Sequence, residues 1–363
     1  MNLKKIDKHY SSFLGIFNPY ESFPYKLNRD IPMYDIQAYK SNPKYRFVYD
    51  KLFIVQSQHL PGGELKDFKD FNDTFPIFIK PRWGHKTASS KNCYKIKSHD
   101  ELKPHLHKKN MMWSSFIDAK EGMTDFVLVN GEIVYQLTYT YSEKQYGFAD
   151  VWKYVSSDNV PPIEVTEWVT KHLSGYTGPL NVQYRNIYII EVGMRFARSG
   201  MYIESSGHKP LIDAINTMWE TKTWMVRKDL DIKPYYTFKC WSPIPVFCLI
   251  PQHVLDAIMK MFGAMCFYEY YFEPTGKNST VFFQFLHKDF ETGMKLKVII
   301  ENLMLFVNIT FIIVTVLSIG CYILKIPCNY LIATMIGMIF LSADNSLNII
   351  YTQITHQKQF LNM

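Results

Sequence analysis

The chain has 363 residues, enough for two domains of ordinary size or for one domain with large appendages. Hydrophobic residues make up 47% of it and charged residues 20%, and 26 Phe and 25 Tyr are present, which excludes a disordered or collagen-like protein. Its 40 basic and 33 acidic side chains give a net charge of +7 without a run of five or six like charges, so the composition does not favour a nucleic-acid-binding protein.

Residues 1–45 carry Pro19, Pro24, Pro32 and Pro43 among aromatic and basic residues. Prolines at this density interrupt both helices and strands. We therefore expect residues 1–45 to be a reduced N-terminal segment, irregular in structure and wrapped on another part of the molecule.

Short apolar runs between residues 46 and 230 predict β-strands. The runs at 125–129 and 132–137 are joined by Asn130-Gly131, which is the strongest short signal of an antiparallel hairpin. Helices are expected after the N-cap residue Ser98 and at residues 163–174, where apolar residues recur at helical spacing. Further strands are expected at residues 46–57, 75–80, 180–184 and 187–192. Residues 46–230 are therefore expected to form one α+β domain built on antiparallel hairpins.

The C-terminal part is predicted to contain a membrane-spanning helix. Residues 303–324 carry no charge, and as a helix they would cover roughly 33 Å, enough for the bilayer core. The alternative is a buried core helix, but a soluble helix of this length normally has a polar stripe. Residues 330–350 predict a second span, a re-entrant segment or an interfacial helix. The transmembrane region is expected at 298–352, after an extension at 231–297 whose aromatic and Met residues are typical of amphipathic packing, in a core or on the membrane surface.

The charges around this segment predict its orientation. Lys288, Lys295 and Lys297 precede the span, Lys325 alone directly follows it, and His356 and Lys358 lie near the C-terminus, so the positive-inside rule places the large N-terminal part on the cytoplasmic side of the membrane. The first residues lack the pattern of a secretory signal. The six cysteines contain no Cys-x-x-Cys pair, so neither a disulfide framework nor a zinc site is predicted.

Two common phosphate-binding motifs are absent from the sequence. Gly84-His-Lys-Thr87 lacks the preceding glycine of a P-loop and has an intruding histidine, and no G-x-G-x-x-G occurs. Any nucleotide would therefore be bound in another way.

Three blocks of sequence suggest such a way. In residues 75–92 a strand ends in Lys80-Pro81 and continues into a loop of small and hydroxyl residues, which together offer a fixed cation and backbone donors to a polyphosphate. The second block is residues 111–134. The third, residues 175–200, places Gln183 and Glu191 on adjacent strands, where we expect them to face each other and share a divalent cation.

In their order and spacing these blocks resemble the ATP-grasp superfamily, and the third is similar to its carbamoyl-phosphate synthetase and carboxylate-amine ligase branches. The resemblance covers residues 46–225, about half of the chain. It implies an ATP-grasp fold, in which two α+β subdomains with antiparallel sheets clamp ATP. In this chain such a domain at 46–230 would be followed by a C-terminal transmembrane helix or helical hairpin.

The resemblance also implies which residues bind ATP. Two family lysines hold the α and β phosphates, and Lys51 and Lys80 resemble them. The loop from Gly84 to Asn92 resembles the lid over the phosphates, residues 114–117 resemble the hinge that clamps adenine through backbone groups, and Glu121 resembles the carboxylate that binds the ribose. The ATP-binding residues implied are Lys51, Lys80, Gly84, Ser89, Ser90, Ser115, Phe116, Ile117 and Glu121.

For the metal, the resemblance implies that Gln183 and Glu191 bind Mg²⁺, or Mn²⁺ in its place, and that Arg195 holds the transferred phosphate. The chain departs from the family at Gly193, where many members have an Asn as a further metal ligand. Family enzymes also carry a complete domain before the lysines, whereas about 45 residues precede them here, so we expect the substrate platform to be missing or reduced.

Each of these residues has a structural alternative. Lys51 and Lys80 would then be ordinary surface lysines and Glu121 a solvated carboxylate. Glu191 lies in an apolar run, where an unpaired carboxylate is costly, so it is expected to have a metal or an arginine such as Arg195 as its partner.

The function implied is acyl-phosphate chemistry. The chain would be a membrane-anchored, ATP-dependent carboxylate-amine ligase, forming a C–N bond, with ATP, a small carboxylate, an amine and the lipid bilayer as partners and no nucleic acid. The first alternative is an ATP-grasp scaffold that binds nucleotide at a membrane without catalysis. The second is a small channel or transporter subunit with a soluble cap, which one or two weakly polar spans disfavour.

Overall fold

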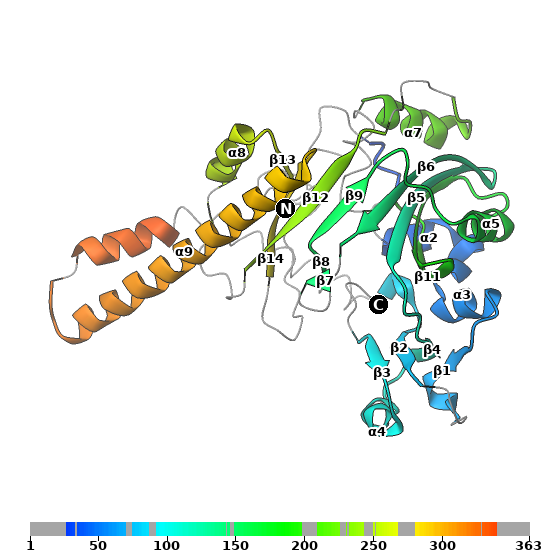
Figure 1. Ribbon diagram of the computed structural model, residues 1–363, viewed down its shortest axis with the longest axis horizontal. Helices are drawn as coiled ribbons and strands as arrows, with labels where there is room; N and C mark the ends of the chain where they lie inside the picture. Colours follow the sequence, from blue (N-terminus) through cyan, green and yellow to red (C-terminus); the bar gives the residue numbers. More distant parts are fainter. Residues whose placement is uncertain are drawn as a thin grey trace, which may run out of the picture. The chain divides into compact units, whose positions relative to one another are not determined.

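The computed structural model describes residues 27–32, 35–69, 75–86, 92–142, 144–145, 149–197, 209–225, 230, 232–242, 250, 252–267, 280–327 and 329–339 (Figure 1). The chain divides into two compact units. The N-terminal unit comprises Leu27–Tyr141 and Val155–Lys233, and the C-terminal unit comprises Met1–Lys26, Ser142–Tyr154 and Pro234–Met363, of which Met1–Lys26 lies outside the described residues.

The N-terminal unit contains two antiparallel sheets with short helices around them. Its helices are α2 (Asp35–Ser41), α3 (Lys51–Ser57), α4 (His99–Leu102), α5 (Ile163–His172) and α7 (Lys209–Thr221), and its 3₁₀ helices are η1 (Pro43–Tyr49), η2 (Leu65–Asp67), η3 (Gly84–Lys86) and η4 (Lys103–His105). Its strands are β1 (Gly62–Glu64), β2 (Ile77–Pro81), β3 (Tyr94–Ile96), β4 (Met111–Ser115), β5 (Glu121–Val129), β6 (Glu132–Tyr141), β10 (Gly178–Arg185) and β11 (Tyr188–Gly193).

The smaller sheet has the order β1-β4-β2-β3, with each neighbouring pair antiparallel. Alternation along β2 turns Ile77 and Ile79 into a core formed with Leu65, Ile96, Leu102 and Met111. The helix expected after Ser98 is α4, and the Ser98 hydroxyl accepts a hydrogen bond from the backbone N–H of Glu101. This sheet presents Lys80 near the end of β2.

The larger sheet of the N-terminal unit has the order β11-β10-β5-β6, and its pairs are also antiparallel. The predicted hairpin is confirmed: β5 and β6 are joined by Asn130 and Gly131, whose φ angles are 50° and 87°. A two-residue turn with two positive φ angles suits the twist of the flanking strands, and Asn-Gly adopts it at low cost. The expected strands at 180–184 and 187–192 are β10 and β11, and the helix expected at 163–174 is α5.

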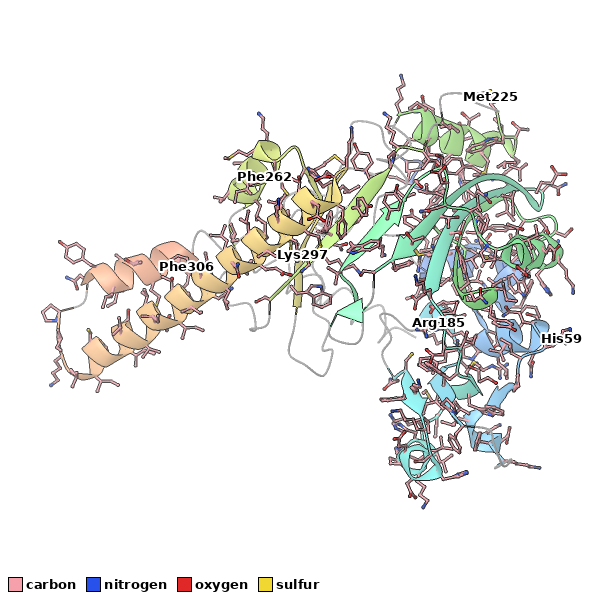
Figure 2. The ribbon with its side chains drawn as sticks, viewed as in Figure 1. His59, Arg185, Met225, Phe262, Lys297 and Phe306 are labelled. Atoms are coloured by element: carbon pink, nitrogen blue, oxygen red, sulfur yellow. The ribbon has the colours of Figure 1, made fainter. Side chains whose placement is uncertain are left out.

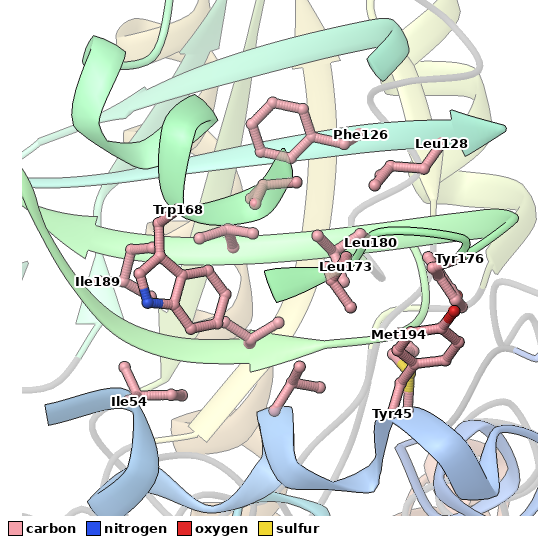
Figure 3. Close-up of a cluster of buried hydrophobic side chains, with 14 of the residues drawn as sticks. Tyr45, Ile54, Phe126, Leu128, Trp168, Leu173, Tyr176, Leu180, Ile189 and Met194 are labelled. Atoms are coloured by element: carbon pink, nitrogen blue, oxygen red, sulfur yellow. The ribbon is translucent and has the colours of Figure 1, made fainter. Parts of the chain in front are cut away.

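Strand alternation gives this sheet one apolar and one polar face. Leu180, Val182 and Val192 pack with Trp168 of α5 and with Ile54 of α3 in the largest core of the unit (Figure 3). Residues at the intervening positions point to the other face, because successive side chains of a strand alternate. Those residues include Asp125, Asn181, Gln183 and Glu191. The alternation that buries the apolar residues therefore also places these polar residues together on the opposite face of the sheet.

The strand expected at residues 46–57 is wrong, because the segment forms η1 and α3. The carboxylate of Asp50 accepts a hydrogen bond from the backbone N–H of Leu52 and caps α3. A short apolar run cannot by itself distinguish a strand from a buried helix. The segment expected to be irregular before residue 46 contains α2.

The C-terminal unit has the strand order β9-β12-β14-β13. Its elements are β7 (Lys144–Gln145), β8 (Ala149–Asp150), β9 (Trp152–Val155), β12 (Tyr235–Ser242), α8 (Gln252–Met261), β13 (Met265–Phe267), β14 (Thr280–His287) and α9 (Phe290–Ile323). The first part of α9 packs on this sheet through Leu296, Ile300 and Met304, which share a core with Phe238 and Phe285. The amphipathic packing expected in this extension is thus a core between a sheet and two helices.

Helix α9 continues beyond the strands of its unit (Figure 1), and Figure 2 labels Lys297 over the sheet and Phe306 past it. It is long and apolar enough to cross a membrane by length and composition, with a mean hydropathy of 2.4 in its most apolar stretch, of which only 17% is buried. A shorter apolar helix covers Asn329–Ile339, and the rest of the expected second segment lies outside the described residues. The low burial distinguishes α9 from the core helix of a soluble protein.

Candidate functional site

Two buried lysines of the N-terminal unit meet at strand β11. Lys51 opens α3 and Lys80 lies on β2, and the two residues are only 5% and 6% exposed. The Nζ of Lys51 lies 3.2 Å from Oε2 of Glu191, and the Nζ of Lys80 donates to the backbone oxygen of Ile190 at 3.1 Å. The two predicted phosphate-binding lysines are therefore not surface lysines, and both lie beside the strand that carries the predicted metal ligand.

The two segments that carry these lysines are joined by an ion pair between Arg82 and Asp50, which was not predicted from the sequence. Arg82, two residues after Lys80, donates from Nε and Nη2 to the carboxylate of Asp50, at 2.8 and 2.5 Å. The backbone N–H of Lys51 also donates to the carbonyl of Arg82 at 2.9 Å. A bidentate arginine–carboxylate pair sets orientation as well as distance. The start of α3 and the end of β2 are thus held together.

Burial has a direct electrostatic consequence at Lys80. Desolvation, followed by the charge of Lys51, lowers the pKa of Lys80 from 10.5 to about 8. The Lys80 side chain is still mainly protonated at neutral pH, but its buried charge costs free energy of desolvation. An anion bound beside it would offset this unfavourable free energy.

The predicted pairing of Gln183 with Glu191 is confirmed, because the two residues are direct partners in the β10–β11 ladder. Directly opposed residues place their side chains on the same face of a sheet. Carboxylate and carboxamide oxygens are the hard ligands that Mg²⁺ prefers. Among the residues described, no group of three His, Cys, Asp or Glu side chains gathers as a metal site. A magnesium ion at Gln183 and Glu191 would therefore rely on further oxygens, as it does in nucleotide sites, where phosphates and water complete the shell.

Gly84 brings backbone close to these charges. A Cβ placed on Gly84 would lie 3.4 Å from Cε of Lys51 and 3.6 Å from Oε1 of Glu191. Any larger side chain at this position would project between the two charged groups. The ATP-binding role that the sequence analysis assigned to Gly84 stays a prediction. Ser89 and Ser90 of the predicted lid lie outside the described residues.

The residue after Gly84 anchors this turn. His85 is only 7% exposed, and its ring stacks on Tyr39 of α2 with a centroid distance of 3.7 Å. Burial lowers its pKa to about 4, so the imidazole is neutral at physiological pH. The packing of His85 was not predicted, because its partner Tyr39 is distant in the sequence.

The predicted adenine hinge and ribose ligand lie at one end of strands β5 and β10. The backbone N–H groups of Ser115 and Phe116 donate to the carbonyls of Pro61 and Pro76, at 3.0 and 3.3 Å. Arg185 donates to the carbonyl of Ile117 at 3.1 Å and to Glu121 at 3.3 Å. Arg185, missed from sequence, therefore connects the hinge to the ribose candidate.

Arg195 is buried and held by a carboxylate from α2. Its Nε and Nη2 donate to Oδ2 of Asp35 at 3.0 and 2.8 Å, and its Nη1 donates to the carbonyl of Phe196 at 3.1 Å. The expected arginine partner of Glu191 is thus replaced by Lys51, and Arg195 pairs with Asp35 instead. Asp35 was missed because it precedes Arg195 by 160 residues.

Asp125 is a fully buried carboxylate on the polar face of the sheet. It accepts hydrogen bonds from Tyr139 at 2.7 Å, from Asn181 at 2.8 Å and from the backbone N–H of Ala197 at 2.8 Å. Burial raises its pKa to about 6, and the three hydrogen bonds oppose this shift. Asp125 holds the segment that follows β11, and with it Arg195, against the sheet.

No protein-family model and no curated protein matches the chain. Among solved structures, the carboxyaminoimidazole ribonucleotide synthase of Aspergillus clavatus, complexed with ATP, is 11% identical and covers 71% of this chain and 74% of its own, with a TM-score of 0.52. An L-amino acid ligase from Bacillus licheniformis is 16% identical over 71% of each chain, with a TM-score of 0.48. The first likeness is one of fold, and it agrees with the antiparallel sheets described above. The chain has the ATP-grasp fold, as its three sequence blocks predicted.

Proposed function

We propose that the chain is an ATP-dependent ligase that activates a carboxylate as an acyl phosphate and joins it to an amine, and that it is anchored in a membrane. The observation that carries this proposal is the meeting of Lys51, Lys80 and Glu191, with Gln183 opposite Glu191, on an ATP-grasp fold. Burying two ammonium groups costs free energy of desolvation and does not stabilise a hydrophobic core. A bound polyphosphate would compensate both positive charges, which gives the two lysines a function.

In this proposal Lys51 and Lys80 bind the phosphates, residues 114–117 hold the adenine through their backbone, and Glu121 binds the ribose. Gln183 and Glu191 would hold Mg²⁺ or Mn²⁺, which when bound supplies positive charge to the phosphoryl group. The burial of both lysines excludes water around their ammonium groups, and exclusion of water strengthens their attraction for the phosphates.

The ion pair between Lys51 and Glu191 would exchange partners when the nucleotide binds. Lys51 would turn to a phosphate and Glu191 to the cation, so neither the buried ammonium group nor the half-buried carboxylate is left uncompensated at any stage. Such an exchange costs less than separating the pair alone.

The reaction has two steps. A carboxylate oxygen of the substrate attacks the γ-phosphorus, the bond from that phosphorus to the bridging oxygen breaks, and ADP leaves. The amine nitrogen then attacks the acyl carbon, its carbon–oxygen bond to phosphate breaks, and the nitrogen loses a proton to solvent. Arg195, oriented by Asp35, would hold the transferred phosphate. Positioning and charge compensation supply most of the rate, and no general base is needed.

The membrane anchor in this proposal is the part of α9 beyond the sheet. Residues 306–323 cover roughly 27 Å at about 1.5 Å per residue, close to the thickness of a bilayer core. Three polar side chains there hydrogen-bond within the helix: Asn308, Thr315 and Ser318 donate to carbonyls one turn back, at 3.0, 2.8 and 2.7 Å. The positive-inside rule then places the N-terminal unit on the cytoplasmic side. Extraction of membranes with alkaline carbonate tests the anchor: the chain should stay in the pellet, and release into the supernatant would refute it.

The alternative is a nucleotide-binding scaffold without catalysis. Gly193 in place of a metal-ligand Asn favours it, and so does the internal pairing of Lys51 with Glu191 and of Arg195 with Asp35. The two proposals differ in turnover, since only a ligase releases ADP.

The test is ADP release by the full chain in detergent, measured with MgATP and pairs drawn from a panel of amino acids. The ligase predicts ADP release that depends on both substrates and falls at least about 100-fold in Lys80→Ala and Glu191→Gln. Lys109→Ala and Glu132→Gln, at exposed positions, are matched controls. Full ADP release by Lys80→Ala and Glu191→Gln would refute the mechanism. ATP binding without ADP release from any pair would favour the scaffold.

A further inference from the structure

Position 193 lies on the same face of β11 as Glu191, because residues two apart in a strand point the same way. A Cβ placed on Gly193 would lie 2.6 Å from Oδ1 of Asp35. No side chain tolerates such an approach. The carboxylate of Asp35, from α2, therefore takes up the space that a side chain at position 193 would need.

The two oxygens of Asp35 have different surroundings. Oδ2 accepts both hydrogen bonds from Arg195. Oδ1 is buried, and within the described part of the chain it has no hydrogen-bond partner. A buried carboxylate oxygen without a donor is costly. Because this oxygen lies where a side chain beside Glu191 would be, a cation near Glu191 would satisfy it.

We propose that Oδ1 of Asp35 is a further oxygen ligand of the divalent cation held by Gln183 and Glu191, reaching it from α2 through the space left by Gly193. This inference rests on the proposed function. It gives the cation two carboxylates and one carboxamide, a set that suits Mg²⁺ when phosphates and water complete the shell.

The structure keeps Asp35 in a defined position. Its Oδ2 is fixed by the Nε and Nη2 of Arg195, and α2 is held on η3 by the stacked rings of Tyr39 and His85. A ligand must be oriented before the metal arrives if affinity is to be high. The pairing with Arg195 orients one oxygen of the carboxylate and leaves the other for the cation.

The first test is Mn²⁺ binding, measured by electron paramagnetic resonance on the full chain with a non-hydrolysable ATP analogue. In Asp35→Asn the guanidinium of Arg195 selects the amide oxygen, so the NH₂ group replaces Oδ1 and cannot bind a cation. We expect the Kd of Mn²⁺ to rise about 10-fold or more. Asp67→Asn, at an exposed position, is the matched control and should leave the Kd unchanged. An unchanged Kd in Asp35→Asn overturns the proposal.

The second test exchanges the two positions. Asp35→Ala removes the ligand and should weaken Mn²⁺ binding. Asp35→Ala combined with Gly193→Asn gives position 193 its own side-chain oxygen in the space that Asp35 vacates, and we expect it to recover most of the Mn²⁺ affinity. If Asp35 only orients Arg195, the added Asn cannot help, because Arg195 still lacks its partner. Failure of the double variant to improve on Asp35→Ala, with circular dichroism unchanged, therefore overturns the proposal.

Nucleotide binding without metal separates this inference from the proposed function. A fluorescent ATP analogue in EDTA should bind wild type and Asp35→Asn alike. If wild type binds neither the analogue nor Mn²⁺, the proposed function fails and the role of Asp35 with it. If wild type binds both and Asp35→Asn does so equally well, only the role of Asp35 fails.

Discussion

Replacing Lys80 with Met should stabilise the N-terminal unit while it abolishes nucleotide binding. Burial and the charge of Lys51 lower the pKa of Lys80 from 10.5 to about 8. At about 1.36 kcal/mol per pKa unit, the protonated lysine costs the native state roughly 3 kcal/mol. Met has a similar length and no charge, but it loses the hydrogen bond to Ile190, worth about 1 kcal/mol. The net gain at pH 7 is therefore about 2 kcal/mol.

The gain should depend on pH in a defined way. Below about pH 8 Lys80 is protonated in both the native and the unfolded state, and the full cost is present. Between about pH 8 and 10.5 the unfolded chain binds more protons than the native chain, so native stability rises with pH. By about pH 10 the remaining cost is below roughly 1 kcal/mol, and the advantage of Met should vanish.

Urea unfolding of the full chain in detergent, followed by tryptophan fluorescence at pH 7 and pH 10, measures both effects. Lys109→Met, at an exposed position, is the matched control and should change little at either pH. If Lys80→Met destabilises the protein at pH 7, or changes its stability equally at pH 7 and pH 10, the buried charge is not the cost that we infer.

Three further predictions concern the same unit. MgATP binding at pH 8 should take up protons, because the phosphates raise the pKa of Lys80 from about 8; calorimetry in buffers of different ionisation enthalpy measures the uptake, and its absence would place Lys80 away from the phosphates. Gly84→Val should weaken ATP binding at least about 10-fold, since its side chain projects against Lys51 and Glu191, whereas Gly320→Val, at a position with no neighbouring atom within 4 Å, should not; equal affinities in a fluorescent-ATP titration would contradict this. Burial raises the pKa of Asp125 from 3.8 to about 6, so stability should fall as pH rises from about 4 to 6, and a pH series of urea midpoints should be flatter in Asp125→Asn.

Local sequence rules predicted the parts of the site that depend on neighbouring residues. Gln183 and Glu191 lie on two strands joined by a short turn, as predicted, and a β-bulge between Gln183 and Tyr184 shifts the register by one residue, which brings Glu191 instead of Ile190 opposite Gln183. The Asn130-Gly131 turn followed from the same kind of rule. The resemblance placed Lys51 in the site even though its segment was expected to be a strand, because its block was matched by order and spacing and not by secondary structure.

Contacts between distant residues were out of reach of the sequence. The stacking of His85 on Tyr39 and the pairing of Arg82 with Asp50 depend on how α2, α3 and β2 pack. The sequence shows Asp125 in an apolar run and does not reveal its hydrogen-bond partners, because these come from β6, β10 and the segment after β11. In α9 the apolar window begins at residue 303, whereas the helix begins at Phe290, because one face of its first turns packs on a sheet that composition does not reveal.

The boundary expected at residue 46 leads to a last prediction, because α2 lies before it and belongs to the N-terminal unit. A chain that begins at residue 46 loses Asp35 and leaves Arg195 buried without its carboxylate, which typically costs about 3–5 kcal/mol. It also loses Tyr39, on which His85 stacks. We expect this chain to unfold at a much lower urea concentration than a chain that begins at Leu27, which keeps both residues. Equal urea midpoints would mean that α2 is an appendage, as the composition of residues 1–45 suggested, and that Arg195 finds another partner.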